Sequence, residues 1–216
     1  MDQLPAAVVF DMDGLLFDSE ALYRDALLAV ARAQGFAFAA ADFPALIGRP
    51  WSANRVTLQR HLGAGRDVEA VQAAWMREYE ARRPALALKP GAAALLDRLD
   101  ALRLPRAICT SSGHATVARN LRLHGLEGRF DAVIAAGDYA CGKPAPDPYR
   151  AAAARLGLPA GGCLALEDSA AGIRSAAAAG MRAVMVPDLL PPDDALRRLC
   201  EAVLPDLHAV RRRWFG

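Results

Sequence analysis

The stretch "VVFDMDGLLFDSE", residues Val8 to Glu20, begins as an apolar run and then places two acidic residues one position apart. Apolar side chains that stop abruptly at acids predict a buried strand ending at the edge of a sheet. On an extended backbone, side chains two positions apart point to the same side, so we expect the carboxylates of Asp11 and Asp13 to lie close together. Two unit charges about 4 Å apart repel by about 4 kcal/mol at an effective dielectric of about 20. The rest of the chain must therefore supply a compensating charge.

Further short apolar runs follow this one, and segments with helical spacing separate them. Strands are expected at residues 7–10, 107–109, 132–135, 164–166 and 183–186. Helices are expected between them at residues 91–103, 114–124, 147–156 and 169–179. Such alternation is typical of βαβ units. It predicts an α/β fold: a Rossmann-like core with a parallel sheet and helices on both faces.

The region from residue 17 to residue 87 breaks the alternation, because it contains only helical patterns. These patterns cover residues 19–34, 42–46, 52–61 and 67–83. An all-helical block between the first and second strands predicts an inserted cap domain. The core domain is then made of residues 1–16 and 88–216.

Composition excludes several classes of protein. The net charge of +2 over 216 residues provides no electrostatic basis for binding nucleic acid. No apolar run is long enough to span a bilayer, and the N-terminal residues lack the basic and apolar regions of a signal peptide. The cysteines show no metal-binding spacing, so we expect reduced thiols in a cytoplasmic protein. Nothing in the sequence implies a membrane partner or an obligate protein partner.

Polar residues follow four of the expected strands, at the edge where an open parallel sheet binds its ligands. In chain order they are Asp11 and Asp13 after the first strand, Thr110, Ser111 and Ser112 after the second, Lys143 after the third, and Glu167 and Asp168 after the fourth. The three hydroxyl residues are expected to open a helix. Each motif alone is also typical of a turn or a helix cap. Their joint occurrence in this order favours a functional site.

The chemistry of these residues points to phosphoryl transfer. Carboxylates without histidine or cysteine are the ligands that Mg²⁺ prefers. A hydroxyl and free N–H groups at a helix N-terminus suit a phosphate group, and Lys143 adds a charge that neutralises both phosphate and nucleophile. Of 26 basic residues only Lys89 and Lys143 are lysines. Lys89, which precedes Pro90, is interpreted as incidental.

The segments "FDMDGLLFDSE", "ICTSS", "GKPAPDPY" and "LALEDSAAG" resemble, in this order, the four motifs of the haloacid dehalogenase superfamily. The resemblance is to phosphatases with a helical cap, close to the β-phosphoglucomutase-like branch. It implies that Asp11 attacks phosphorus to form an aspartyl-phosphate, while Asp13 protonates the leaving oxygen and later deprotonates water. It also implies that Mg²⁺ is held by Asp11, the Asp13 backbone carbonyl and Asp168, with Glu167 ligating directly or through water.

The remaining candidates complete the expected site. Thr110 and Lys143 join the catalytic set, and Ser111, Ser112 and the cap-loop residue Arg49 are candidates for binding substrate. The expected activity is Mg²⁺-dependent hydrolysis of a small phosphorylated metabolite, such as a sugar phosphate.

Two alternatives stay open. A β-phosphoglucomutase would move the phosphoryl group between sugar positions, but Tyr23 and Trp51 stand where mutase-type sequences carry a histidine and an arginine. A phospho-ligand sensor without catalysis is the second alternative. The dehalogenase and phosphonatase branches lack the second aspartate that Asp13 supplies, which argues against both.

Overall fold

The computed structural model describes residues 3–47, 51–63 and 65–216. Contacts between residues divide the chain into two compact units. One unit joins Met1–Phe17 to Leu88–Gly216, and the other is the single segment Asp18–Ala87. Because the chain leaves and re-enters the first unit, that unit is discontinuous in sequence.

The discontinuous unit is built on a parallel sheet, as the sequence predicts. Its strands in the described part of the chain are β1 (Ala7–Phe10), β2 (Arg106–Gly113), β3 (Ala132–Ala136), β4 (Cys163–Glu167), β5 (Arg182–Met185) and β6 (Ala202–Val203). Their order across the sheet is β3-β2-β1-β4-β5-β6. All four residues of β1 are buried, as expected for a central strand covered on both faces. The two-residue strand β6 is absent from the sequence prediction, because two residues are too few to show the alternation of apolar side chains that marks a strand.

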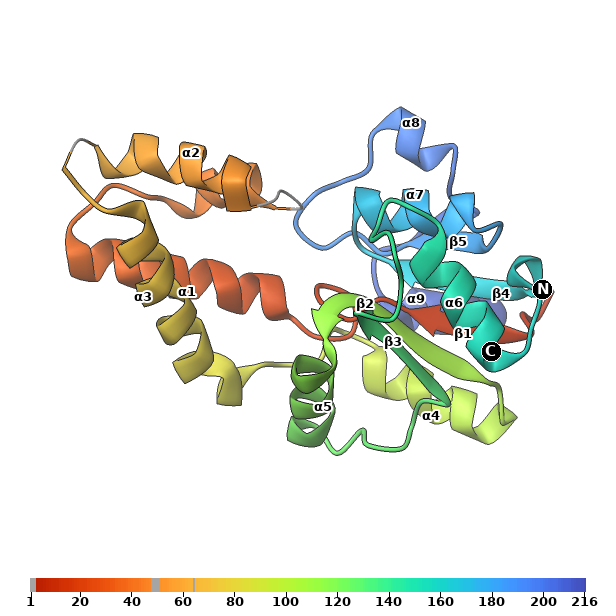
Figure 1. Ribbon diagram of the computed structural model, residues 1–216. Coiled ribbons are helices and arrows are strands. Elements are labelled where there is room, and N and C mark those ends of the chain that lie inside the picture. The colour runs from red at the N-terminus through yellow and green to blue at the C-terminus, as the bar shows by residue number, and fades with distance from the viewer. Residues whose placement is uncertain (1–2, 48–50, 64) are drawn as a thin grey trace. The chain divides into compact units, whose positions relative to one another are not determined.

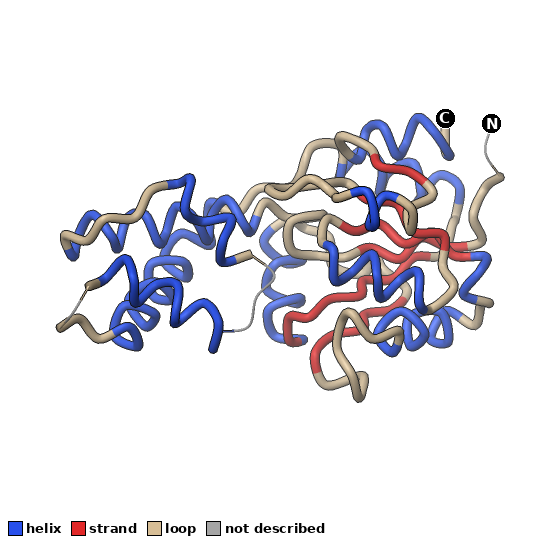
Figure 2. The backbone as a smooth tube through the Cα atoms, turned by 90° about the horizontal axis from the view of Figure 1, so that it is seen from above, coloured by secondary structure: helices blue, strands red, loops and turns tan. Residues whose placement is uncertain are grey.

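Helices cover both faces of this sheet. They are α4 (Ala92–Leu102), α5 (His114–Leu123), α6 (Asp147–Leu156), α7 (Ala170–Ala178), α8 (Asp194–Arg197) and α9 (Leu207–Trp214), with a 3-10 turn at Ala160–Gly162. Figure 1 shows α7 above the sheet and α4 and α5 below it, and Figure 2 gives the same layers from above. Tyr149 of α6 and Ile173 of α7 pack with Val9 and Cys109 in one apolar cluster. These layers confirm the predicted α/β fold.

Strand register decides which residues meet at the carboxyl edge of the sheet. Phe10, the last residue of β1, is paired with Ile108 of β2 and with Leu166 of β4. The Asp11 N–H then donates to the Leu166 carbonyl at 2.9 Å. The residues that directly follow these three strand positions are therefore neighbours, although more than 50 residues separate each from the next along the chain.

The second strand is longer than predicted, and the expectation that the hydroxyl residues open a helix is wrong. β2 runs to Gly113 because Gly113 pairs with Ala136 of β3 after an irregularity in register. Thr110 and Ser112 therefore lie on the extended end of a strand, and α5 begins only at His114. The Thr110 hydroxyl accepts the Ser112 N–H at 3.0 Å. Pairing with β3 outweighs the local capping preference of serine and threonine.

The segment Asp18–Ala87 is helical, and none of its described residues forms a strand. It contains α1 (Ser19–Gln34), α2 (Trp51–Leu62) and α3 (Val68–Arg82), with 3-10 turns at Ala40–Leu46 and Arg83–Ala85. The rings of Tyr23 and Trp75 lie 4.1 Å apart, and the Trp75 indole N–H donates to the Tyr23 carbonyl at 2.7 Å. An aromatic core thus holds α1 against α3. In the described part of the whole chain, no helix combines the length and apolarity needed to cross a membrane.

Candidate active site

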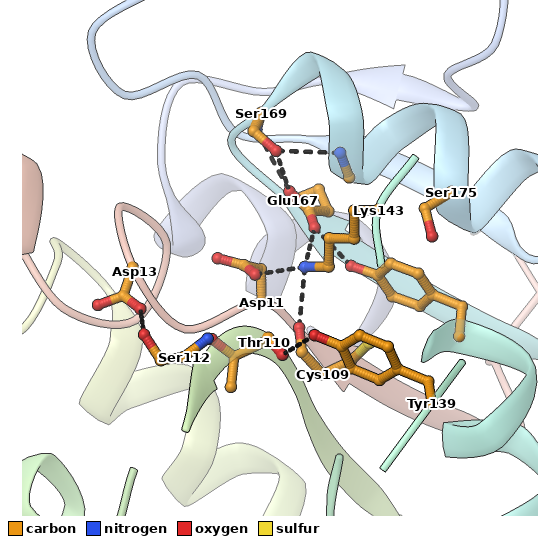
Figure 3. Close-up of polar contacts among 12 residues, drawn as sticks. Asp11, Asp13, Cys109, Thr110, Ser112, Tyr139, Lys143, Glu167, Ser169 and Ser175 are labelled. Carbon is orange, nitrogen blue, oxygen red and sulfur yellow. Dashed lines mark hydrogen bonds and ion pairs between the residues drawn. The ribbon is translucent and has the colours of Figure 1, made fainter. Parts of the chain in front are cut away.

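Asp11 and Lys143 form a buried ion pair at the carboxyl edge of the sheet (Figure 3). The Lys143 ammonium lies 2.5 Å from Asp11 Oδ1, and the two side chains are 6% and 10% exposed. Burial raises the pKa of the Asp11 carboxyl to about 8, although Lys143 opposes this change and the nearby Glu167 adds to it. The compensating charge that the sequence requires for Asp11 therefore comes from Lys143, 132 residues away along the chain.

Lys143 is held by three acceptors, which matches the three N–H donors of an ammonium group. Besides Asp11 it donates to Glu167 Oε1 at 2.5 Å and to the Cys109 carbonyl at 2.9 Å. Its nitrogen also lies 5.1 Å from the centre of the Tyr149 ring. Burial works against the ammonium, yet Asp11 and Glu167 hold the pKa of Lys143 well above its usual value. Lys143 is therefore a permanent positive charge in this site.

Glu167 is fully buried, and both of its carboxylate oxygens are engaged. Oε1 accepts from Lys143 and from the Tyr149 hydroxyl at 2.7 Å. Oε2 accepts from the Ser169 hydroxyl at 3.0 Å and from the Ser169 N–H at 3.3 Å. A carboxylate offers about four acceptor positions, so these contacts use them all. Gly172 leaves room for this arrangement, because a Cβ at its position would overlap the Glu167 carboxylate.

Asp13 points away from Asp11 and towards the end of β2 (Figure 3). Its Oδ2 accepts the Ser112 hydroxyl at 2.7 Å. The expectation of two adjacent carboxylates is therefore only partly met, because the chain turns after β1 instead of staying extended. Asp13 remains the smallest of the charged influences on the pKa of Asp11.

Three carboxylates form a group that could hold a metal ion. One oxygen from each of Asp11, Glu167 and Asp168 lies within 4.8 Å of the others. Gly14 adjoins the group, and a Cβ at its position would strike the Asp168 carboxylate. Gly14 has φ +82°, a left-handed conformation that disfavours other residues. The tight turn after β1 therefore depends on glycine for both space and backbone angle.

The other predicted site residues take different positions. Thr110 is 1% exposed, and its carbonyl accepts the Tyr139 hydroxyl at 3.1 Å. Ser111 follows Thr110 and is exposed at the same end of β2. Arg49 lies outside the described residues.

Three side chains that contact this region were not predicted from the sequence. Tyr149 and Tyr139 support Glu167 and Thr110, but each reads as an ordinary apolar or loop residue. Lys89, which the sequence analysis interprets as incidental, pairs through its ammonium with Asp188 at 2.7 Å. The rarity of lysine in this chain was the signal that could have found it.

The buried acidic group and its neutralising lysine lie at the carboxyl edge of a doubly wound parallel sheet, which is the edge where enzymes of this α/β class bind their ligands. Residues 5–180 match the haloacid dehalogenase-like hydrolase family. The chain belongs to this family and is a hydrolase.

Similar proteins agree with this assignment. Protein CbbY of Rhodobacter capsulatus is 37% identical over 94% of this chain and 94% of its own length. The fructose-1-phosphate phosphatase YqaB of Escherichia coli is 33% identical over 84% of this chain and 96% of its own. A haloacid dehalogenase family hydrolase from Deinococcus radiodurans, solved with bound phosphate and sodium, is 28% identical, with a TM-score of 0.83 over 97% of this chain and 95% of its own.

Proposed function

We propose that this chain is a Mg²⁺-dependent phosphatase that hydrolyses small phosphomonoesters, such as sugar phosphates, through an aspartyl-phosphate on Asp11. The observation that carries the proposal is the buried contact between Asp11 and Lys143, beside the carboxylates of Glu167 and Asp168. An aspartate becomes an effective nucleophile where nearby positive charge keeps it ionised and neutralises the phosphate. Because burial raises the pKa of Asp11 to about 8 even beside Lys143, the positive charge of Mg²⁺ is needed as well to ionise Asp11 at neutral pH. The phosphatase named among the relatives supports the substrate class.

The donor set fits Mg²⁺, because it offers carboxylate oxygens and no nitrogen or sulfur ligand. Asp11 and Asp168 are the side chains that would hold the ion, together with the Asp13 backbone carbonyl that the family resemblance implies. Glu167 would act through water or through Lys143, since its oxygens already carry four hydrogen bonds. When bound, Mg²⁺ supplies positive charge that balances the phosphoryl oxygens and the ionised Asp11.

In the proposed reaction a carboxylate oxygen of Asp11 attacks phosphorus, and the bond between phosphorus and the ester oxygen breaks. The leaving oxygen takes a proton from Asp13. Water then attacks phosphorus and transfers its proton to Asp13, which releases inorganic phosphate and regenerates Asp11. Lys143 stays protonated throughout, and Ser112 orients the Asp13 carboxyl through their hydrogen bond.

The helical unit Asp18–Ala87 is proposed to be the cap domain. In this role it admits the substrate, supplies specificity contacts that include Arg49, and limits the access of water. A cytoplasmic location is part of the proposal, since all four cysteines are free thiols.

Phosphoryl transfer between sugar positions is the competing activity, and Tyr23 argues against it. The mutase-type histidine at this position could exchange a proton near neutral pH, whereas burial raises the pKa of the Tyr23 phenol to about 12. The Tyr23 hydroxyl contacts Met76 Sδ at 3.7 Å, within the aromatic core of the helical unit. A phenol in this setting cannot replace an imidazole as a proton carrier.

We expect net hydrolysis when β-glucose 1-phosphate is supplied with catalytic glucose 1,6-bisphosphate. Both products are followed together, and inorganic phosphate should form faster than glucose 6-phosphate. The reverse order would overturn the phosphatase assignment. A panel of phosphorylated metabolites, assayed with Mg²⁺ for phosphate release, then identifies the preferred substrate. A sensor without catalysis would release no phosphate from any member of the panel.

Metal removal is expected to abolish activity. Without a divalent cation, the negative charges of Asp11, Glu167 and Asp168 face a phosphate dianion, and the single charge of Lys143 does not balance them. EDTA followed by dialysis should therefore reduce turnover to background, and added Mg²⁺ should restore it. Ca²⁺ should not restore it, because its larger and looser coordination shell disturbs in-line geometry. Unchanged turnover after EDTA and dialysis would contradict the metal dependence.

A further inference from the structure

The second lysine of the chain forms a second ion pair beside the acidic group, from elements that the proposed reaction does not use. Lys89 lies where the chain re-enters the α/β unit, and its N–H donates to the Leu16 carbonyl at 2.9 Å. Asp188 lies in the segment after β5. Lys89 Nζ donates to Asp188 Oδ1 at 2.7 Å, with side-chain exposures of 19% and 7%. Two distant segments of the chain thus bring together the buried Asp188 carboxylate and the Lys89 ammonium that balances its charge.

Among the described residues, the other oxygen of Asp188 has no hydrogen-bond partner. Asp188 Oδ2 is buried and unsatisfied in the described part of the chain. A buried polar atom left unpaired costs about 1–3 kcal/mol, and such an atom in a native fold calls for an explanation, for example a bound water or ion. Since Lys89 occupies only Oδ1, the ion pair by itself does not account for Oδ2.

The position of Asp188 Oδ2 indicates which group it acts on. Asp188 Oδ2 lies 3.4 Å from the position that a Cβ on Gly14 would occupy, and the Asp168 carboxylate lies against the same position. The two carboxylates therefore approach one another across Gly14, with no side chain between them at that point. Asp168 is one of the three carboxylates of the metal-binding group. Asp188, which is not one of those three carboxylates, thus lies beside the group.

We propose that Asp188 is a positioning residue for the cation: its Oδ2 accepts a hydrogen bond from a water molecule of the ion's hydration shell, and Lys89 holds the carboxylate in place. The inference rests on the Mg²⁺ site of the proposed function and extends it by one residue pair. Mg²⁺ keeps several waters when it binds to proteins. Outer partners of this kind orient the inner shell and change metal affinity when they are removed.

Variants of the two partners should shift Mg²⁺ affinity in opposite directions. Asp188→Asn removes the negative charge that faces the hydrated cation, so the dissociation constant for Mg²⁺ alone should rise about 10-fold. Lys89→Gln removes a positive charge near the cation, while the glutamine amide can still donate a hydrogen bond that holds the Asp188 carboxylate, so Mg²⁺ should bind as tightly as to wild type or more tightly. Isothermal titration calorimetry measures both constants without any substrate.

Two comparisons make the experiment specific. Glu201→Gln breaks the Arg182–Glu201 pair at 2.7 Å, which belongs to β5 and the segment before β6, and should leave Mg²⁺ affinity unchanged. The Asp188→Asn effect should persist in about 1 M KCl, where the Debye length is about 3 Å, because the contact is local. Its disappearance in high salt would reduce Asp188 to a distant charge and overturn the proposal.

The remaining outcomes separate this inference from the proposed function. If Lys89→Gln and Asp188→Asn both weaken Mg²⁺ binding, or both leave it unchanged, the pair is only a structural bridge and the inference is wrong. If Asp188→Asn fails to fold, judged by thermal unfolding in EDTA, a lower affinity of Lys89→Gln still overturns it. Asp168→Asn should abolish binding. Wild-type protein that binds no Mg²⁺ would overturn the metal site and this inference together.

Discussion

Replacing Asp11 with asparagine is expected to lower the turnover of a phosphomonoester by about a thousandfold or more, as loss of a nucleophile does in other covalent enzymes. Asparagine has nearly the same shape but lacks the charge needed to attack phosphorus. The fold should survive, because Lys143 keeps its contacts with Glu167 and with the Cys109 carbonyl. Steady-state phosphate release measures the loss.

Asp97→Asn is the matched control, since the Asp97 carboxylate is 70% exposed on α4 and belongs to a surface ion pair. Its turnover should equal that of wild type. Rapid acid quenching with a labelled phosphomonoester adds a direct test of the covalent step: label should remain on wild-type protein and not on Asp11→Asn. Retention of more than a few per cent of turnover by Asp11→Asn would show that another group is the nucleophile.

Replacing Lys143 with arginine is expected to reduce kcat by about 100-fold, although the positive charge is conserved. The Lys143 ammonium donates to three acceptors from one nitrogen, and the Lys143 side chain is only 6% exposed. A guanidinium is planar and longer, so it cannot reach Asp11, Glu167 and Cys109 with the same geometry. A displacement of about 1 Å in a reacting group can cost about 100-fold in rate.

The matched control is Arg182→Lys, the exchange in the opposite direction at a partly exposed ion pair of β5. Its kcat should stay close to wild type. Thermal unfolding of Lys143→Arg shows whether kcat falls because the charge is displaced or because the variant is unfolded. The variant should unfold cooperatively and still lose kcat. Kinetics close to those of wild type would mean that Lys143 contributes only charge, with no requirement for its shape.

Much of the fold and the composition of the site could be predicted from the sequence. The sequence predicts the strands at residues 7–10, 107–109, 132–135 and 164–166. Runs of apolar residues, and the turn residues that end them, are local signals that need no knowledge of the fold. Once the sheet is parallel, the residues after each strand must share one edge. Asp11, Lys143, Glu167 and Asp168 meet for that reason, and no knowledge of side-chain contacts was needed to expect it.

Which of these side chains contact one another was decided only by the tertiary structure. Asp13 reaches Ser112 because β2 extends to Gly113, which pairs with Ala136 of β3, a long-range effect that outweighs local capping. Glu167 faces Lys143 and Tyr149 in space that Gly172 of α7 leaves open, because a Cβ at position 172 would overlap the Glu167 carboxylate. Register and packing depend on contacts between distant segments, which propensity and spacing do not encode.

The two lysines show most clearly what the sequence determines and what only the tertiary structure decides. Composition alone marked both as unusual, and sequence position correctly separated Lys143 from a surface charge by its place after a strand. Sequence position did not reveal the ion pair of Lys89, because the proline that follows Lys89 is typical of a simple turn. Asp188 reaches Lys89 across 99 residues through the strand order β1-β4-β5. Residue types determined the chemistry available to this chain, whereas the close packing of distant loops determined which charges became partners, because a buried charge is stable only where the fold brings it a counter-charge.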